Sequence, residues 1–227
     1  EPFLLTVIFS ANIGSVATEI GNPQNAYIAI KSGIPFFYYL IKLLPVSILS
    51  LLISMLILYL IYKNDLKKKI KVERIEKGEI VHKNLFYIGL ITMIFIFISF
   101  LFVKNIAIVP FIGASFLLFI TPFFENFDPR KIIKSVDWGI ILFFIGLFIV
   151  LEGVQVSGLL NEIMRIFQIF APLTNPFWYV TLVSVLSNLV SNVPAVMLLS
   201  PSTSGTNYWL ALAMASTLAG NATILGA

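Results

Sequence analysis

Long apolar runs separated by short polar segments dominate the pattern of this chain. A membrane helix needs about 20 mostly apolar residues. Residues 36–62 form one such run, which we interpret as an interfacial segment followed by a membrane span, and residues 85–154 hold three further spans. Residues 155–175 place apolar and polar side chains at helical spacing, which predicts an amphipathic interfacial helix. The pattern as a whole predicts an all-α polytopic membrane protein.

One apolar stretch near the start is interrupted by small polar residues. Residues 10–25 read Ser-Ala-Asn-Ile-Gly-Ser-Val-Ala-Thr-Glu-Ile-Gly-Asn-Pro-Gln-Asn. Gly and Pro weaken a helix and leave backbone groups unpaired. At membrane depth this is tolerated only where the segment is buried in protein or lines a watery cavity. We therefore predict a broken helix and its connector over residues 1–35, with residues 26–35 as the connector.

A similar interruption returns near the other end. Residues 216–227 align with residues 10–22 with one gap, so that Ser, Gly, Ala-Thr and Gly follow in the same order. Interrupted apolar segments in corresponding halves of a chain are a pointer to the binding site of a secondary transporter. We predict a second broken helix over residues 207–227.

A third polar cluster cuts the apolar residues 176–206. It reads Ser187-Asn188-Leu189-Val190-Ser191-Asn192-Val193-Pro194. The stretch is long enough for one span or for two half-spans. We favour the second interpretation, a re-entrant hairpin with the Ser-Asn cluster at its tip.

Composition agrees with a membrane protein. Hydrophobic residues make up 59% of the chain and charged residues 11%, whereas soluble domains are roughly half apolar and a quarter charged. Basic residues gather in residues 63–84, which the positive-inside rule makes a cytoplasmic loop of a multi-pass cell-membrane protein. The net charge of +4 follows from this loop and is no sign of nucleic-acid binding.

Several classes of function lack the residues that they need. The chain has no Cys, and its one His, His82, lies in the basic loop, where a solvated side chain is the simplest interpretation. No phosphate-binding loop precedes a helix. We therefore expect no enzyme, no cofactor and no metal site other than one for sodium. A passive channel or a non-transport membrane subunit stays an alternative, because broken helices and hairpins also build filters.

The three interrupted motifs together resemble the ion transporter superfamily of arsenite permeases, divalent anion/sodium symporters and citrate carriers. Asp137-Trp138-Gly139 at the start of an apolar span resembles the arsenite permease branch. The resemblance covers the end of a first repeat and most of a second. It implies an inverted-repeat carrier with broken helices and a re-entrant hairpin, and a homodimer in the lipid bilayer. The rest of the first repeat would then precede Glu1, so we expect a fragment of a longer chain.

The resemblance also implies a site where the hairpin tip meets both breaks. The substrate-binding residues would be Ser191, Asn192, Val193, Pro194, Asn221, Ala222 and Thr223. The ion-binding residues would be Ser10, Asn12, Gly14, Ser15, Ala17, Thr18, Ser187, Asn188 and Gly220. Neutral Ser, Thr and Asn oxygens suit sodium, which is a hard cation. Val193 replaces the Thr that dicarboxylate carriers have at the tip, which removes a donor for a carboxylate.

Two acids stand in apolar surroundings. Glu19 and Glu152 are candidate proton or cation sites, although each could instead reach an aqueous surface. The leading hypothesis is a secondary active transporter of a small anion, an arsenite-type oxyanion or a carboxylate, coupled to a sodium or proton gradient. The alternative within the same fold is a sodium/proton antiporter. Since no Cys is present, arsenite would be bound through hydroxyl and amide groups and not through thiolates.

Overall fold

The computed structural model describes residues 2–65, 82–103, 105–124, 129–170 and 174–222. Within these ranges the regular secondary structure consists of helices. The chain forms two compact units, one made of Glu1–Lys67 with Leu142–Ala227 and the other of Lys68–Ile141. The predicted all-α class is confirmed. The predicted basic loop, residues 63–84, falls mostly outside the described residues.

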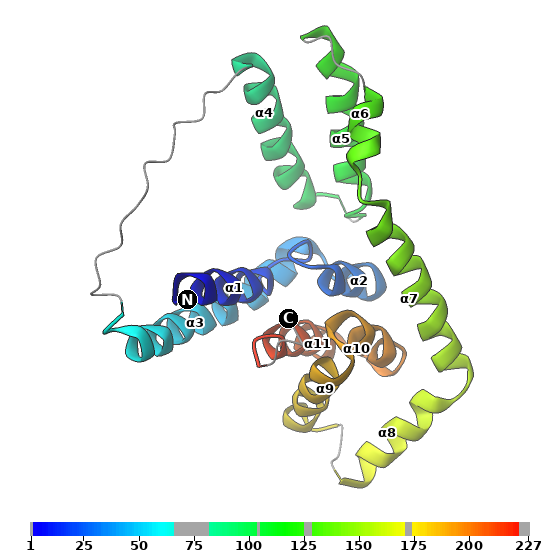
Figure 1. Ribbon diagram of the computed structural model, residues 1–227. Coiled ribbons are helices and arrows are strands. Elements are labelled where there is room, and N and C mark those ends of the chain that lie inside the picture. The colour runs from blue at the N-terminus through cyan, green and yellow to red at the C-terminus, as the bar shows by residue number, and fades with distance from the viewer. Residues whose placement is uncertain (1, 66–81, 104, 125–128, 171–173, 223–227) are drawn as a thin grey trace. The chain divides into compact units, whose positions relative to one another are not determined.

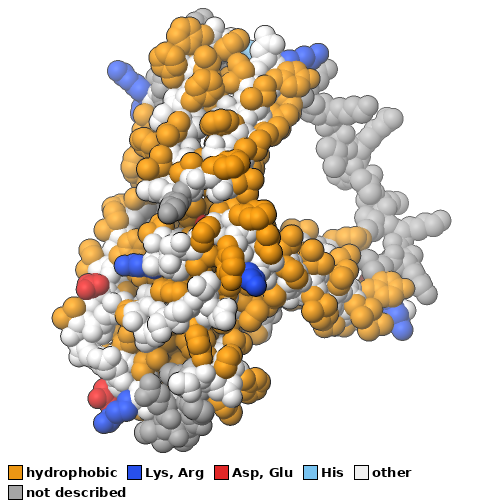
Figure 2. All heavy atoms as spheres, turned by 180° about the vertical axis from the view of Figure 1, so that it is seen from behind, with side chains coloured by type: hydrophobic (Ala, Val, Ile, Leu, Met, Phe, Trp, Pro, Cys, Tyr) orange, Lys and Arg blue, Asp and Glu red, His pale blue; other side chains and the backbone are white. Residues whose placement is uncertain are grey.

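Three helices are long and apolar enough to cross a membrane. They are α3 (Phe36–Tyr62), α4 (Lys83–Phe100) and α7 (Trp138–Val156). Most of their apolar side chains are exposed on the protein surface. On the face drawn in Figure 2, hydrophobic side chains cover much of the surface, and charged ones are few and scattered. Such a surface needs an apolar environment, so the polytopic membrane assignment is confirmed.

The unit Lys68–Ile141 contains α4 and three shorter helices, followed by the start of α7. The shorter helices are α5 (Ile108–Ile120), η1 (Thr121–Phe123) and α6 (Pro129–Ser135). α4 packs against α5. Gly113 on α5 lies so close to α4 that a Cβ would come within 2.4 Å of Ile96 Cδ1. A small residue at a helix contact is typical of membrane packing, because it lets the two backbones approach.

The larger unit holds every segment with a predicted site residue. Besides α3 and most of α7 it contains α1 (Pro2–Ser15), α2 (Pro23–Ser32), α8 (Leu159–Phe170), α9 (Pro176–Val190), α10 (Asn192–Leu199), η2 (Ser200–Ser202) and α11 (Thr206–Ala219). In Figure 1, α1 and α2 lie end to end above α11 and α10. α3 packs along α1, and α9 packs against both α10 and α11. The two interrupted segments and the hairpin therefore share one core.

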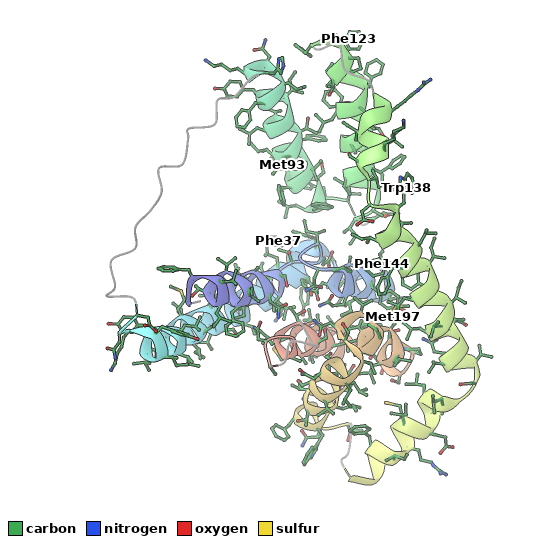
Figure 3. The ribbon with its side chains drawn as sticks, in the orientation of Figure 1. Phe37, Met93, Phe123, Trp138, Phe144 and Met197 are labelled. Carbon is green, nitrogen blue, oxygen red and sulfur yellow. The ribbon has the colours of Figure 1, made fainter. Side chains whose placement is uncertain are left out.

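The buried residues of that core come from α2, α3, α9, α10 and α11 and from the segments that follow α1 and α2. Its fully buried members include Val16, Ile28, Tyr39, Leu182, Val183, Val196, Leu199 and Leu212. A smaller cluster joins α7 and α8 to α10 through Leu151, Leu160 and Met197, the last of which is labelled in Figure 3. On α8, Asn161, Glu162 and Arg165 are exposed, and Arg165 forms an ion pair of 3.1 Å with Glu162.

Most of the predicted connector over residues 26–35 forms the helix α2. Asn22 is the N-cap of this helix, and its side chain accepts a hydrogen bond from Asn25 N at 2.8 Å. Pro23 follows at the first helical position, which suits its fixed φ. Gly33 ends the helix at φ 64°, and its N–H donates to Ala29 O at 3.0 Å. These capping residues stabilise both ends of the helix, although the residues between them have a mixed composition.

Candidate ion and substrate site

The first break lies between α1 and α2, over residues 16–22. α1 ends at Ser15, so its last carbonyl groups lack helical donors. The buried Asn25 supplies donors, because its Nδ2 lies 3.0 Å from Ser15 O and 3.2 Å from Thr18 O. Gly21 permits the fold-back, since a Cβ there would lie 2.2 Å from Ser15 O. One amide and one glycine therefore hold the break in a defined shape.

Side chains of the last turn of α1 and of this break are hydrogen-bonded to the end of α11. Asn12 Nδ2 donates to Thr217 O at 3.0 Å and to Asn221 Oδ1 at 2.9 Å. Asn22 Nδ2 donates to Thr217 Oγ1 at 3.1 Å and to Ser15 Oγ at 3.0 Å. We call these five residues the inter-break network. It joins the two segments whose sequences correspond, so the two interruptions meet in space.

The hairpin tip is Ser191, between α9 and α10. Its φ of 73° and ψ of 161° are nearly restricted to glycine, and such strain costs roughly 1–3 kcal/mol. α10 begins at Asn192 without a side-chain cap from Ser191. Asn192 Oδ1 and Ser187 Oγ are buried, and neither has a hydrogen-bond partner in the described part of the chain. Because buried polar atoms are nearly always paired, the tip offers two groups suited to a ligand.

Helix ends give this region charges of both signs. A helix N-terminus carries roughly half a positive charge and a C-terminus roughly half a negative one. α10 directs its N-terminus at the tip, which favours an anion. α1, α9 and α11 each end at an interruption, where their carbonyl groups and the neutral side-chain oxygens favour a cation.

The predicted substrate residues lie at two of these places. Ser191, Asn192, Val193 and Pro194 form the tip and the first turn of α10, Asn221 and Ala222 lie in the turn after α11, and Thr223 is outside the described residues. In the described structure no side-chain hydrogen bond joins the tip to the inter-break network. The substrate-binding roles stay predictions.

The predicted ion-binding residues gather at the ends of three helices. Ser10, Asn12, Gly14 and Ser15 belong to the last turns of α1, Ala17 and Thr18 to the first break, Ser187 and Asn188 to the last turn of α9, and Gly220 follows α11. Asn12 and Ser15 are engaged within the inter-break network, and Asn188 Nδ2 donates to Ser184 O at 2.9 Å. The ion-binding roles stay predictions.

The two predicted acids differ in their surroundings. Glu19 follows α1 in the first break and is 1% exposed, so it does not reach an aqueous surface. Glu152 is exposed on α7. It lines a cavity of about 360 Å³ together with Lys31, Gln155 and Ser200. Glu152 therefore borders an open cavity, whereas Glu19 is enclosed by protein.

Three residues of the site were not singled out from the sequence. Asn22 and Asn25 lie inside the predicted break, and the Asn-Pro start of α2 is the signal that could have identified them. Thr217 lies in the second repeat of the pattern, yet its carbonyl and hydroxyl both accept hydrogen bonds from the first break. Only the packing of the two segments reveals that role.

A model of the citrate transporter family matches residues 1–219. The chain belongs to the citrate transporter family. It is similar to an uncharacterised transporter of Methanocaldococcus jannaschii, with 32% identity over 87% of this chain and 47% of that protein. It is also similar to a silicon efflux transporter of Oryza sativa subsp. japonica, with 28% identity over 100% of this chain and 61% of that protein. The similarity to the ion transporter superfamily predicted from the three motifs is confirmed.

A further relative agrees with this assignment. The Dictyostelium discoideum transporter named arsB shares 26% identity over 99% of this chain and 60% of its own length. The chain thus spans 47% to 61% of the length of these three relatives. Membership of a transporter family, together with the long apolar helices, makes this a multi-pass membrane protein.

Proposed function

We propose that this chain forms the site-bearing part of a secondary active transporter for a small anion, an arsenite-type oxyanion or a carboxylate. A sodium or proton gradient drives the transport, and the working protein is a homodimer in the cell membrane with residues 63–84 on the cytoplasmic side. Membership of the citrate transporter family supports transport of a small anion. The greater length of the relatives supports the proposal that further segments belong to the protein.

One observation carries the proposal for the anion: the hairpin tip combines a helix N-terminus with buried, unpartnered polar atoms. Ser191 gives α10 no side-chain cap. Asn192 is 8% exposed, and its amide offers both donors and an acceptor. An anion seated here would accept from the N–H groups of Asn192 and Val193 and from Asn192 Nδ2, whereas the unpartnered Asn192 Oδ1 can only accept and would suit a hydroxyl of a protonated anion. Removing water from such a site strengthens both interactions.

The inter-break network supports the transport mechanism. Asn12 and Asn22 connect the first break to the end of α11, so the two breaks move together or separate by exchanging a few hydrogen bonds. Inverted-repeat carriers gain alternating access by moving one group of helices about a central site. A network of neutral amides suits that task, because its hydrogen bonds exchange without separating charges.

The test is anion-dependent thermal stabilisation of the complete detergent-solubilised protein. A ligand that binds the folded state raises its apparent stability by mass action. Citrate, arsenite, phosphate and silicate form the panel, each with and without sodium. We expect at least one anion to stabilise the wild type and Asn192→Asp to lose this response, because a fixed negative charge at the tip repels the anion.

The matched control is Asn207→Asp. Asn207 is exposed in the first turn of α11, so this variant makes the same chemical change at another helix N-terminus. It should keep the wild-type response. If no anion stabilises the wild type while sodium and pH do, the sodium/proton antiporter takes the place of the anion transporter. Equal stabilisation of Asn192→Asp and the wild type by the anion would show that the tip is not part of the anion site.

A further inference from the structure

The cavity that Lys31 and Glu152 line, which we call the α2–α7 cavity, shares no lining residue with the hairpin tip or with the inter-break network. Its volume of about 360 Å³ lies in the range of small-molecule sites. Its walls come from α2, α7, α11 and the end of α10 with η2, and the lining residues all belong to the larger unit. The cavity is therefore a candidate for a second ligand site.

One cationic and one anionic side chain face this cavity from different helices. Lys31 lies in the last turn of α2, and Glu152 lies on α7. In the described part of the chain they form no ion pair with each other or with any other residue, and Lys31 Nζ lies 5.8 Å from the ring centre of Tyr27. A simple anion would be repelled by Glu152 and a simple cation by Lys31. A ligand that carries both charges is attracted by both walls.

Hydrogen bonds and apolar contacts hold the walls of the cavity together. The hydroxyl groups of Tyr27 on α2 and Ser200 on η2 are hydrogen-bonded at 3.1 Å. Gln155 Nε2 on α7 donates to Met197 O on α10 at 3.2 Å. Buried Leu151 packs in one cluster with Met197, where α7 passes beside the ends of α2 and α10 (Figure 1). The cavity is thus a built feature of the unit and not a gap between loose helices.

The position of the cavity along α7 matches the level of lipid headgroups. Glu152 lies four residues before the end of this membrane-spanning helix at Val156, which is about 6 Å along the helix axis. The amphipathic α8 begins at Leu159, where the sequence predicts an interfacial helix. Tyr27 and Trp209 also line the cavity, and these residue types are enriched at membrane–water interfaces. The cavity therefore lies at the boundary between the hydrocarbon and the headgroups.

The face of α7 that carries Glu152 continues as an apolar strip towards the middle of the membrane. Ile145, Phe148 and Glu152 are three and four residues apart, so they share one face of the helix. Ile145 is 50% exposed and Phe148 is 45% exposed, and Phe148 also lines the cavity. An acyl chain can lie along this strip while its headgroup occupies the cavity. A small soluble zwitterion would leave the strip unused.

We propose that the α2–α7 cavity binds the headgroup of a phosphatidylethanolamine lipid. Lys31 contacts the phosphate as a point charge, and Glu152 accepts hydrogen bonds from the ammonium group. Cavities with basic residues between membrane helices are suited to lipid headgroups. Free phosphoethanolamine offers the same two charges, but only the lipid also covers the apolar strip of α7. The binding site does not depend on the transport function proposed above.

The experiment measures lipid binding to the complete protein after delipidation in detergent. Thermal stability is followed while dihexanoyl-phosphatidylethanolamine is added, and the wild type should gain stability with a saturable midpoint. The phosphatidylcholine with the same chains has no N–H to donate to Glu152, and the phosphatidylglycerol has no cation, so both should need higher concentrations. Lys31→Gln and Glu152→Gln should each raise the phosphatidylethanolamine midpoint about 10-fold, through the loss of one charge-assisted contact.

Two matched variants control for the loss of an exposed charge. Lys42→Gln on α3 removes an exposed lysine that also lies over a tyrosine ring, 5.4 Å from the ring centre of Tyr38. Glu162→Gln removes an exposed carboxylate on α8. Neither residue lines the cavity, so both variants should keep the wild-type midpoint.

Four results would overturn the inference. The first is a wild type that phosphatidylethanolamine does not stabilise. The second is an equal midpoint for phosphatidylcholine, which would show that Glu152 does not read the ammonium group. The third is free phosphoethanolamine with the same midpoint as the lipid, which would identify a soluble zwitterion as the ligand. The fourth is an equal shift of the midpoint in the control variants.

Discussion

Replacing Asn25 with Ala removes the amide that holds the first break. Asn25 is 0% exposed, and its Nδ2 lies 3.0 Å from Ser15 O and 3.2 Å from Thr18 O. Thr18 O keeps a second donor, since Gly21 N lies 3.2 Å from it. Ser15 O has no other hydrogen bond within the described structure. The substitution therefore removes both bonds that Nδ2 donates and a long bond of 3.4 Å that Oδ1 accepts from Thr217 Oγ1, and it leaves the Ser15 carbonyl unsatisfied.

The size of the effect follows from these contacts. A buried carbonyl without a donor costs about 1–3 kcal/mol, and the shared hydrogen bond contributes about 1 kcal/mol. The small cavity left by the amide adds a further fraction. We expect a loss of about 3 kcal/mol in the free energy of unfolding and a corresponding fall in Tm, which is smaller per kcal/mol in a longer protein.

The assay is thermal unfolding of the complete protein in detergent, followed by tryptophan fluorescence. Asn25→Asp tests the direction of the hydrogen bonds. The substitution keeps the shape of the side chain but replaces the donating nitrogen with an oxygen that faces two carbonyl oxygens. It should lower the free energy of unfolding by at least as much as Asn25→Ala. Asn161→Ala on the exposed face of α8 is the control and should stay within about 0.5 kcal/mol of the wild type. The account of the break fails if Asn25→Ala and Asn161→Ala unfold at the same temperature.

Two further predictions concern the backbone of the break and of the tip. Gly21→Ala should destabilise the protein by about 1–3 kcal/mol or more, because the Cβ would lie 2.2 Å from a carbonyl oxygen of α1. Gly14→Ala has open space around the Cβ and should be neutral or stabilising by about 0.5–1 kcal/mol, so equal Tm values for the two variants would contradict this account. Ser191→Gly should raise stability by about 1 kcal/mol, because it relieves the strain at φ 73°, while it weakens transport. Thermal unfolding and anion uptake, measured on one preparation of Ser191→Gly, check its stability and its transport. A Tm below that of the wild type would show that no strain is stored at the tip.

The sequence predicted the regions of interruption because small polar residues inside apolar runs have few other roles in a membrane. The repeated order of Ser, Gly, Ala-Thr and Gly coincides with the ends of α1 at Ser15 and of α11 at Ala219. The sequence could not predict that Asn12 and Asn221 would touch, because correspondence between repeats does not imply contact. That contact depends on how α1 and α11 pack.

Other features of this unit depend on tertiary packing alone. Tyr39 belongs to an apolar run that looks like an interfacial segment, and its burial follows only from the packing of α3 against α1. The sequence allowed Glu19 to contact water, and only the structure shows that protein encloses it. The missed helix α2 is a different case, because its start at Asn22 and its end at Gly33 are local signals that could have been recognised.

Uphill transport by the complete protein in sealed liposomes tests the central claim most directly. Vesicles are given an inward sodium gradient or an inward proton gradient, and a labelled anion that stabilises the purified protein is added at equal concentration on both sides. The account predicts that the anion accumulates above its starting concentration inside, and that collapsing the gradient abolishes the accumulation. The account is contradicted if the anion concentrations inside and outside stay equal under both gradients. A flux that follows only the gradient of the anion itself would identify a passive channel.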